Sequence, residues 1–241
     1  MTSIAIIPAR YDSSRFPGKP LALIQGKPMI QHVYEAASKA VSLSAVIVAT
    51  DDQRIREVVE GFGAVAVMTA TTHLSGSDRI AEVAQGLNAD IIVNIQGDEP
   101  MLKAEMVDDC ISLLSDERAA MSTLKKLITN QEEILDTNVV KVVTDAEGFA
   151  LYFSRMSIPF CRDTLDIKYF KHIGIYGYRR EVLLSLRQRP ECLAEKAEKL
   201  EQLRALHYGY RIKVLETTVH THAVDTPEDI GKVEQWLNTS F

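Results

Sequence analysis

The fold is decided by a stretch near the start of the chain, where an apolar run leads into a basic loop. Residues 4–20 read Ile4-Ala5-Ile6-Ile7-Pro8-Ala9-Arg10-Tyr11-Asp12-Ser13-Ser14-Arg15-Phe16-Pro17-Gly18-Lys19-Pro20. The first four residues are apolar and mostly β-branched, as in a strand that is buried on both faces. Similar runs follow at residues 45–49, 64–67 and 91–95. The sequence therefore predicts a set of buried, parallel strands.

Between these runs, apolar residues recur at the helical spacing i, i+3, i+4 and i+7. Strands and helices that alternate in this way need right-handed crossovers. We therefore predict an α/β fold with a doubly wound, mostly parallel sheet, whose ligands bind beyond the carboxyl ends of the strands. The four helical stripes are Ile30/Val33/Tyr34/Ala37, Ile55/Val58/Val59/Phe62, Ile80/Val83/Ala84/Leu87 and Val107/Cys110/Ile111/Leu114.

The pattern changes after residue 121, where we expect a mixed, antiparallel portion. The turn Asp145-Ala146-Glu147-Gly148 separates strand-like residues 139–144 from 149–154, which is the pattern of a hairpin. Further strands are expected at residues 173–178 and 212–216.

Two helices are also expected in this part of the chain. One carries Ala197, Leu200 and Leu203 on one side, and the last begins at Thr226-Pro227, a typical N-cap and first helical position. Since no repeat or linker interrupts the chain, we predict a single α/β domain over residues 1–241.

Composition limits the classes of function. The 27 Lys and Arg residues against 33 Asp and Glu give a net charge of −6, which leaves no cationic excess for binding nucleic acid. No apolar run approaches the roughly 20 residues that span a bilayer. Residues 1–10 lack the basic start, apolar middle and cleavage site of a signal peptide. We therefore expect a cytoplasmic protein that does not insert into membranes.

Three familiar kinds of site are not supported by the sequence. Cys110, Cys161 and Cys192 are widely spaced and form no C-x-x-C pair, so neither a disulfide framework nor a structural zinc site is supported. Residues 61–66 match G-x-G-x-x-A, but they close a helix instead of opening one, so an NAD site is not expected. Pro20 follows Gly18-Lys19 where a P-loop needs Ser or Thr.

The loop after the first strand is the first candidate site. Arg10, Arg15 and Lys19 lie within ten positions among small and turn-forming residues, an arrangement that can wrap a polyphosphate. The alternative is a solvated basic loop, the usual fate of a charge cluster.

Two acids are candidate metal ligands. Asp98 follows the fourth strand, and Asp225 precedes the last helix. Alone, Asp98 could equally be a turn residue that bonds its own backbone, and Asp225 a helix-start residue with only a capping role. Together with the basic loop, the two acids indicate metal-assisted phosphoryl or nucleotidyl transfer.

Eight strings along nearly the whole chain, in order, resemble the bacterial CMP-Kdo synthetases, the 3-deoxy-manno-octulosonate (Kdo) cytidylyltransferases. The resemblance implies a nucleotidyltransferase α/β fold of the Rossmann-like type, usually dimeric, that makes CMP-Kdo and pyrophosphate from CTP and Kdo for lipopolysaccharide biosynthesis. The strings are Pro8-Ala9-Arg10, Ser13-Ser14-Arg15-Phe16-Pro17-Gly18-Lys19-Pro20-Leu21, Ser75-Gly76-Ser77-Asp78-Arg79, Gln96-Gly97-Asp98, Leu151-Tyr152-Phe153-Ser154-Arg155, His172-Ile173-Gly174-Ile175-Tyr176-Gly177-Tyr178, Leu200-Glu201-Gln202-Leu203-Arg204 and Val224-Asp225-Thr226-Pro227-Glu228-Asp229.

The resemblance also implies roles for single residues. It gives residues 1–120 mainly to CTP binding, 121–223 to the sugar and to dimerisation, and 224–241 to the metal acid and a closing helix. Asp98 and Asp225 would hold Mg²⁺ and, with Arg10 and Lys19, form the catalytic set. Arg10, Ser14, Arg15 and Lys19 would contact the CTP phosphates, Ser75, Arg79 and Gln96 the rest of the nucleotide, and Gln96, Arg155, His172, Tyr176, Glu201 and Gln202 the sugar.

Ordinary structural roles stay open for the sugar-site residues. His172 and Tyr176 share a strand face and could be partly buried core residues. Glu201 and Gln202 could be the wet side of an amphipathic helix, and Arg155 a surface residue at the end of a hairpin.

The chain departs from the family pattern in three places. Ser77 stands where threonine is usual, and the connection from residue 163 to His172 is shorter than in many members. Residues 218–223, before Asp225, occupy a stretch that is often richer in glycine and proline in the family. They include His220 and His222, for which contact with metal or phosphate and an ordinary loop are both open.

The sugar is therefore an open question. Kdo is the default, and the alternatives are 8-amino-3,8-dideoxy-manno-octulosonate, another acidic sugar, or no turnover at all in a CTP-binding sensor.

Overall fold

The computed structural model of the chain describes residues 1–12, 16–73, 75–163 and 165–239. It divides into two compact units. Unit 1 comprises Met1–Asp108 and His220–Phe241, and unit 2 comprises Asp109–Val219. That the two units act as one domain, as the sequence suggests, stays a prediction.

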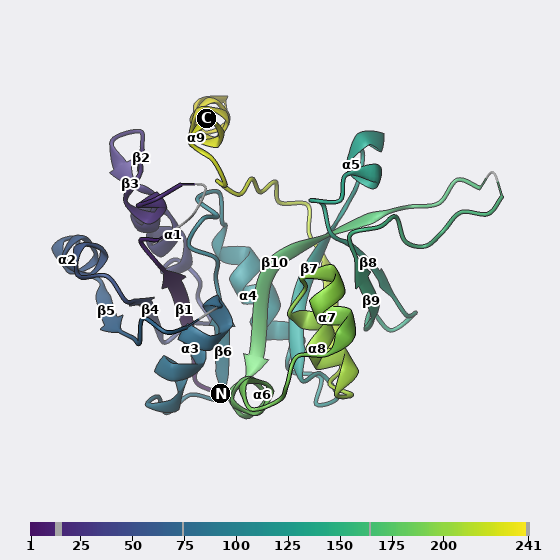
Figure 1. Cartoon of the computed structure of the whole chain (residues 1–241), viewed down its shortest axis with the longest axis horizontal. Coiled ribbons are helices and arrows are strands. Elements are labelled where there is room, and N and C mark those ends of the chain that lie inside the picture. The colour runs from purple at the N-terminus through teal and green to yellow at the C-terminus, as the bar shows by residue number, and fades with distance from the viewer. Residues whose placement is uncertain (13–15, 74, 164, 240–241) are drawn as a thin grey trace. The chain divides into compact units, whose positions relative to one another are not determined.

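Unit 1 contains a parallel sheet with the strand order β6-β1-β4-β5 (Figure 1). β1 is Ser3–Ala9, β4 is Ala45–Thr50, β5 is Val65–Met68 and β6 is Ile91–Asn94. The central strand β1 is almost wholly buried, which is what its continuous apolar run predicts. The predicted parallel strands are confirmed.

The helices of unit 1 follow the predicted stripes. They are α1 (Met29–Ala37), α2 (Gln53–Gly61) and α3 (Gly76–Gln85), while α4 (Ala104–Leu113) crosses the boundary between the units. α2 ends at Gly61, and Gly63 adopts a positive φ of 84° before β5 begins. The glycines that imitate a dinucleotide motif therefore end a helix, as expected.

Unit 2 contains a mixed sheet. β7 (Met121–Leu127) pairs with β10 (Phe170–Arg179) in the antiparallel sense and with β11 (Ile212–Glu216) in the parallel sense. β8 (Lys141–Thr144) and β9 (Ala150–Ser154) form the predicted hairpin. The mostly parallel α/β fold with an antiparallel second portion is thus confirmed. No sequence pattern predicted β7, α5 (Gln131–Leu135) or α6 (Arg180–Arg187).

The single helix expected around Ala197, Leu200 and Leu203 is wrong. The structure has two short helices instead, α7 (Leu193–Glu198) and α8 (Gln202–His207). Lys199 lies between them with a left-handed φ of 54°, which ends α7. Leu200 and Leu203 are buried as predicted, whereas Ala197 is exposed.

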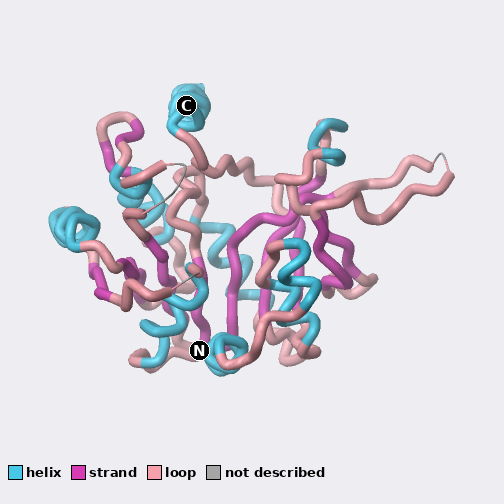
Figure 2. The backbone as a smooth tube through the Cα atoms, in the orientation of Figure 1, coloured by secondary structure: helices cyan, strands magenta, loops and turns pink. Residues whose placement is uncertain are grey.

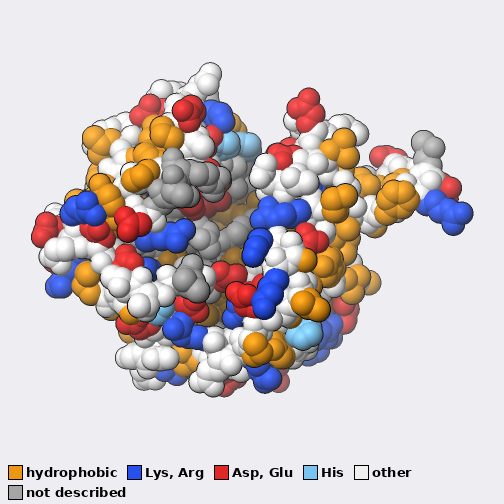
Figure 3. Space-filling model, in the orientation of Figure 1, with side chains coloured by type: hydrophobic (Ala, Val, Ile, Leu, Met, Phe, Trp, Pro, Cys, Tyr) orange, Lys and Arg blue, Asp and Glu red, His pale blue; other side chains and the backbone are white. Residues whose placement is uncertain are grey.

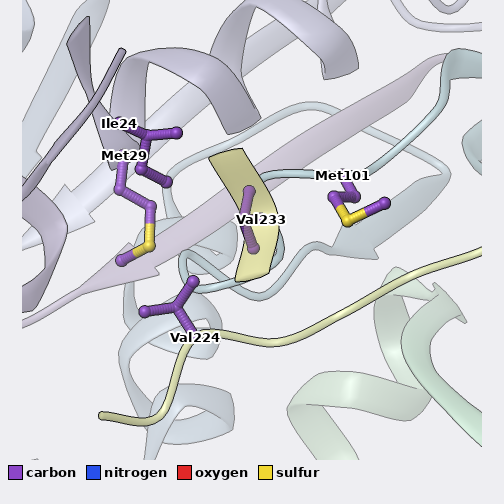
Figure 4. Close-up of a cluster of buried hydrophobic side chains, with 5 residues drawn as sticks. All are labelled: Ile24, Met29, Met101, Val224 and Val233. Atoms are coloured by element: carbon purple, nitrogen blue, oxygen red, sulfur yellow. The ribbon is translucent and has the colours of Figure 1, made fainter. Parts of the chain in front are cut away.

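The end of the chain returns to unit 1 through a hydrophobic cluster. Figure 2 shows the segment between β11 and α9 (Pro227–Thr239) as loop. Val224 of this loop and Val233 of α9 are fully buried against residues from the early part of the chain (Figure 4). The other buried members are Ile24 of β2 (Leu23–Ile24), Met29, which follows β3 (Lys27–Pro28), and Met101. Packing of this cluster fixes where the residues around Val224 lie.

Candidate active site

The basic loop after β1 is closed at its base by a backbone contact. Gly18 N donates to Tyr11 O at 2.8 Å, and Gly18 has a φ of 72° that favours glycine. A Cβ at this position would meet the Tyr11 ring at 3.1 Å. Arg10 is exposed at the start of the loop. Ser14 and Arg15, two of the predicted phosphate contacts, lie outside the described residues.

Lys19 begins a short 3-10 helix (Lys19–Leu21) and joins the two candidate metal acids. Its Nζ lies 2.5 Å from Asp98 Oδ2 and 3.7 Å from Asp225 Oδ1, and it also donates to the carbonyl oxygen of Val224 at 2.9 Å. Asp98 and Asp225 therefore share one cation although they are far apart in sequence. The Lys19 side chain is only 15 % exposed, so its charge is partly withdrawn from water.

Backbone geometry explains how Asp98 reaches this position. It follows β6 in the turn that begins at Gly97, where a Cβ would lie 2.9 Å from the carbonyl oxygen of Pro8. Glycine is therefore required for the turn to approach the end of β1. Val224 N donates to Asp98 O at 2.9 Å, which ties the turn to the C-terminal loop. Gln96, another predicted contact, is half-buried immediately before this turn.

The start of α9 is capped by Asp229. Its Oδ2 accepts hydrogen bonds from the amides of Asp225 and Thr226 at 3.1 and 3.0 Å, and Lys232 donates to Oδ1 at 2.7 Å. Burial acts to raise the pKa of Asp229, but Lys232 and these amides together hold the pKa well below its ordinary value. The third helical residue thus supplies the cap, as in a capping box. This role of Asp229 was missed in the sequence, although an acid at that position is its signal.

The two residues expected near the cytidine are held by protein groups. Ser75 Oγ accepts from the amide of Asp78 at 3.1 Å and caps α3. Arg79 is 3 % exposed and donates to Asp51 Oδ2 at 2.6 Å and to Thr69 Oγ1. Asp51 and Thr69 were not found from the sequence. For Ser75 and Arg79 themselves, contact with a nucleotide stays a prediction.

In unit 2, Arg155 is fixed by backbone oxygens. Its Nε donates to Glu198 O at 2.7 Å and its Nη1 to Thr137 O at 2.9 Å. Its own carbonyl accepts from the ammonium of Lys141 at 2.6 Å, and Lys141 is 0 % exposed. Arg155 is therefore part of an ordered network, not simply a surface residue that ends a hairpin.

His172 and Tyr176 lie together on β10. Their ring centroids are 5.3 Å apart, and the His172 ring also meets Phe153 edge-on at 5.1 Å. Burial lowers the pKa of His172 to about 3 and raises the pKa of Tyr176 well above its ordinary value. Both side chains are therefore neutral at physiological pH. They can form hydrogen bonds with a ligand but not ion pairs.

Glu201 and Gln202 differ in their surroundings. Glu201 is exposed just before α8, while Gln202 is 4 % exposed. The Nε2 atom of Gln202 has no hydrogen-bond partner in the part of the chain that the structure describes. The wet side of a helix is thus a wrong description of Gln202. A buried amide without a partner is costly unless a ligand or water supplies the acceptor.

His220 and His222 have partners within unit 1. The His220 ring stacks on Trp236 with centroids 4.4 Å apart, and His222 Nε2 lies 3.5 Å from Asp229 Oδ1. Among the described residues, no group of three or more His, Cys, Asp and Glu side chains is placed to hold a metal ion. A metal at Asp98 and Asp225 would therefore need further ligands from a substrate or from water.

The surface is mixed in charge. Acidic and basic side chains are interspersed over the face shown in Figure 3, in keeping with the net charge of −6. As far as the structure describes the chain, none of its helices has both the length and the apolar character needed to cross a membrane.

Comparisons with known proteins agree on one family. The cytidylyltransferase family profile matches residues 4–213. The 3-deoxy-manno-octulosonate cytidylyltransferase of Geotalea daltonii is 54 % identical, with 98 % of each chain covered, and that of Solibacter usitatus is 52 % identical, with 99 % of this chain and 95 % of the relative covered.

A solved structure of a CMP:2-keto-3-deoxy-manno-octonic acid synthetase in complex with CTP superposes with a TM-score of 0.96 at 44 % identity, over the full length of both chains. A 4-diphosphocytidyl-2C-methyl-D-erythritol synthase from Anaerococcus prevotii has a TM-score of 0.66 at 13 % identity over 98 % of this chain and 96 % of the other, which shows a common fold alone. The chain belongs to the cytidylyltransferase family, and within it to the 3-deoxy-manno-octulosonate cytidylyltransferases.

Proposed function

We propose that this protein transfers the CMP group of CTP to the anomeric hydroxyl of Kdo, giving CMP-Kdo and pyrophosphate for lipopolysaccharide biosynthesis in the cytoplasm. The family supports the reaction, and the convergence of Lys19, Asp98 and Asp225 is the observation that carries it. Nucleotidyl transfer builds negative charge on the phosphates, and the loop cations Arg10 and Lys19 lie where they could neutralise it.

The donor set fits Mg²⁺. Asp98 and Asp225 offer carboxylate oxygens around one point, and Mg²⁺ is commonly held by one or two carboxylates together with substrate phosphates. Bound there, Mg²⁺ would polarise the reacting phosphoryl group and favour attack by the sugar hydroxyl. Lys19 would then release the carboxylates and place its ammonium on phosphate oxygens.

The remaining residues would bind and orient the two substrates. Ser14 and Arg15 would contact the phosphates, and Ser75, Arg79 and Gln96 would contact the rest of the nucleotide. For the sugar, Arg155 matches the carboxylate in charge, and the amide of Gln202 matches hydroxyl groups. Gln96, His172, Tyr176 and Glu201 complete this sugar set. Attack in line on the α-phosphate needs no covalent enzyme intermediate.

We further propose that the protein is a homodimer that associates through unit 2. Large apolar side chains are exposed there, including Phe160 at 85 %, Leu165 at 67 % and Met156 at 66 %. Figure 3 shows hydrophobic side chains on the segment between β9 and β10 that carries these residues. Apolar exposure of this kind is typical of interaction surfaces. Sedimentation equilibrium of the wild type against Phe160→Ser tests it.

Pyrophosphate release is the decisive assay. CTP is offered with Kdo, with its 8-amino analogue or with a sialic acid, each with Mg²⁺ or with a chelator. We expect release with Kdo and Mg²⁺ and none with the chelator. Faster turnover of the 8-amino sugar or of sialic acid would show that this sugar, and not Kdo, is the preferred substrate. Binding of CTP without turnover of any of these sugars would instead indicate a sensor.

A further inference from the structure

A buried threonine contacts His172 and is not among the residues proposed to bind either substrate. Thr123, in β7, is fully buried. Its Oγ1 lies 2.9 Å from His172 Nε2, 2.7 Å from Ile175 O and 3.1 Å from Ile173 O. Three groups thus surround one hydroxyl, which has a single proton to donate.

The two carbonyl oxygens decide where that proton goes. Both only accept hydrogen bonds, and both lie at the register shift between Ile173 and Tyr176, where the β10–β7 ladder is interrupted. If Thr123 donated to His172, its oxygen would lie 2.7 and 3.1 Å from two carbonyl oxygens with no proton between them, which is a repulsive arrangement. The threonine hydroxyl therefore donates to a carbonyl. Its lone pair then accepts from the imidazole, so Nε2 of His172 carries the ring proton.

This tautomer leaves Nδ1 of His172 as an acceptor. The ring packs against Phe153 and Tyr176, and burial favours its neutral form. Nδ1 forms no hydrogen bond within the residues that the structure describes. His172 is only half-buried, so a ligand can approach part of the ring.

We propose that Thr123 is a positioning residue that holds His172 in the Nε2–H tautomer, so that Nδ1 accepts a hydrogen bond from a hydroxyl of the sugar. The identity of the ligand rests on the proposed function, whereas the tautomer does not. A site built to accept from a hydroxyl discriminates strongly against analogues that lack it.

The tautomer is tested in the substrate-free enzyme by ¹⁵N NMR of the histidine rings, with His172→Gln to assign the signal. We expect the Nε2–H pattern in the wild type and in Thr123→Ser, which keeps the hydroxyl. In Thr123→Val we expect a mixture of tautomers or the Nδ1–H form. A wild-type ring protonated at Nδ1, or an unchanged Nε2–H pattern in Thr123→Val, would overturn the proposal.

Kinetics test the consequence for the ligand. Thr123→Val should raise KM for the sugar by about tenfold or more, the scale of one lost hydrogen bond, with KM for CTP changed less than about twofold. Thr123→Ser should restore the wild-type KM. Equal changes in both KM values, or loss of thermal stability alone, would show a structural role only. A wild type that turns over no sugar would contradict the proposed function, and the NMR result would still decide the tautomer.

Discussion

Replacement of Lys141 by methionine should destabilise the protein by about 3 kcal/mol. Lys141 is 0 % exposed, and its Nζ donates to the carbonyl oxygens of Asp136, Val139 and Arg155 at 2.9, 2.6 and 2.6 Å. Hydrogen bonds from a charged donor contribute about 1.5 kcal/mol each at the lower end, which sets a loss of about 4–5 kcal/mol for three. Methionine also removes the cost of burying an ammonium, which reduces the net loss to about 3 kcal/mol.

Urea unfolding at pH 7 measures this loss, with Lys171→Met as the matched control. Lys171 faces Lys141 in the β10–β8 pairing, but its 2.6 Å ion pair with Glu133 lies nearer the surface. Such pairs contribute about 0–1 kcal/mol. If Lys141→Met costs no more than Lys171→Met, the three-carbonyl network does not stabilise the fold as argued.

The same residue gives a pH dependence of defined sign. Burial lowers the pKa of Lys141 below its ordinary 10.5, so in the alkaline range the unfolded chain holds its proton longer than the folded chain. Stability from Lys141 therefore rises with pH in the window between the lowered pKa and 10.5. The difference between wild type and Lys141→Met should grow from pH 8 to pH 10. A difference that shrinks over this range contradicts the assigned direction.

Three further predictions concern unit 1. Asp98→Asn should reduce turnover about 100-fold or more without unfolding the protein, whereas Glu99→Gln should reduce it less. Equal losses of pyrophosphate release in the two variants would show that Asp98 was wrongly chosen as the metal acid. Lys19→Met should lower turnover but raise the affinity of the substrate-free protein for Mn²⁺, because it removes an ammonium that competes for the two carboxylates. Calorimetry measures this affinity, and weaker Mn²⁺ binding in the variant would contradict a shared cation position. Asp229→Asn should cost about 1 kcal/mol at pH 7 by weakening the helix cap. Because the wild-type carboxyl has a lowered pKa, its advantage is present above the ordinary 3.8 and is lost as pH falls, so urea unfolding at pH 3 should show a smaller difference than at pH 7.

The parallel strands could be predicted because burial on both faces leaves a direct record in the sequence. Ile4–Ile7 carry no polar interruption, and the structure buries all four residues. β7 leaves no such record, since Ser122 and Thr123 interrupt its apolar residues yet are fully buried through hydrogen bonds to backbone oxygens. A polar residue whose partner is contributed by another helix or strand looks exposed in the sequence.

The break between α7 and α8 could not be predicted for a similar reason. A left-handed helix end normally reveals itself as glycine or asparagine, but here it is formed by Lys199. Packing of Leu200 and Leu203 holds the chain in this conformation, and nothing local indicates it. Tertiary contacts therefore override the helical spacing of Ala197, Leu200 and Leu203.

In the candidate site, position in the fold could be predicted for Asp98 but not for Asp225. Asp98 ends a central parallel strand, so the topology alone places it at the ligand-binding edge of the sheet. Asp225 is brought there by the burial of Val224 and by the Val224–Asp98 backbone bond, and its local pattern left a metal ligand and a capping residue equally open. The supporting residues, such as Asp51 beside Arg79, belong to no local pattern.

Arg79 and Lys19, two cationic side chains of unit 1, differ in how freely they can change partners. Arg79 is 3 % exposed, and its guanidinium is held by Asp51 and Thr69, so moving it to a substrate would leave the half-buried carboxylate of Asp51 without this partner. Lys19 holds a single flexible ammonium among oxygens of Asp98, Asp225 and Val224, and a divalent cation could replace it at both carboxylates without loss of charge balance. Exchange of partners on substrate binding is therefore inexpensive for Lys19 and costly for Arg79. We therefore expect Arg79 to shape the nucleotide site through its bonds to Asp51 and Thr69, and Lys19 to change partners when a substrate binds.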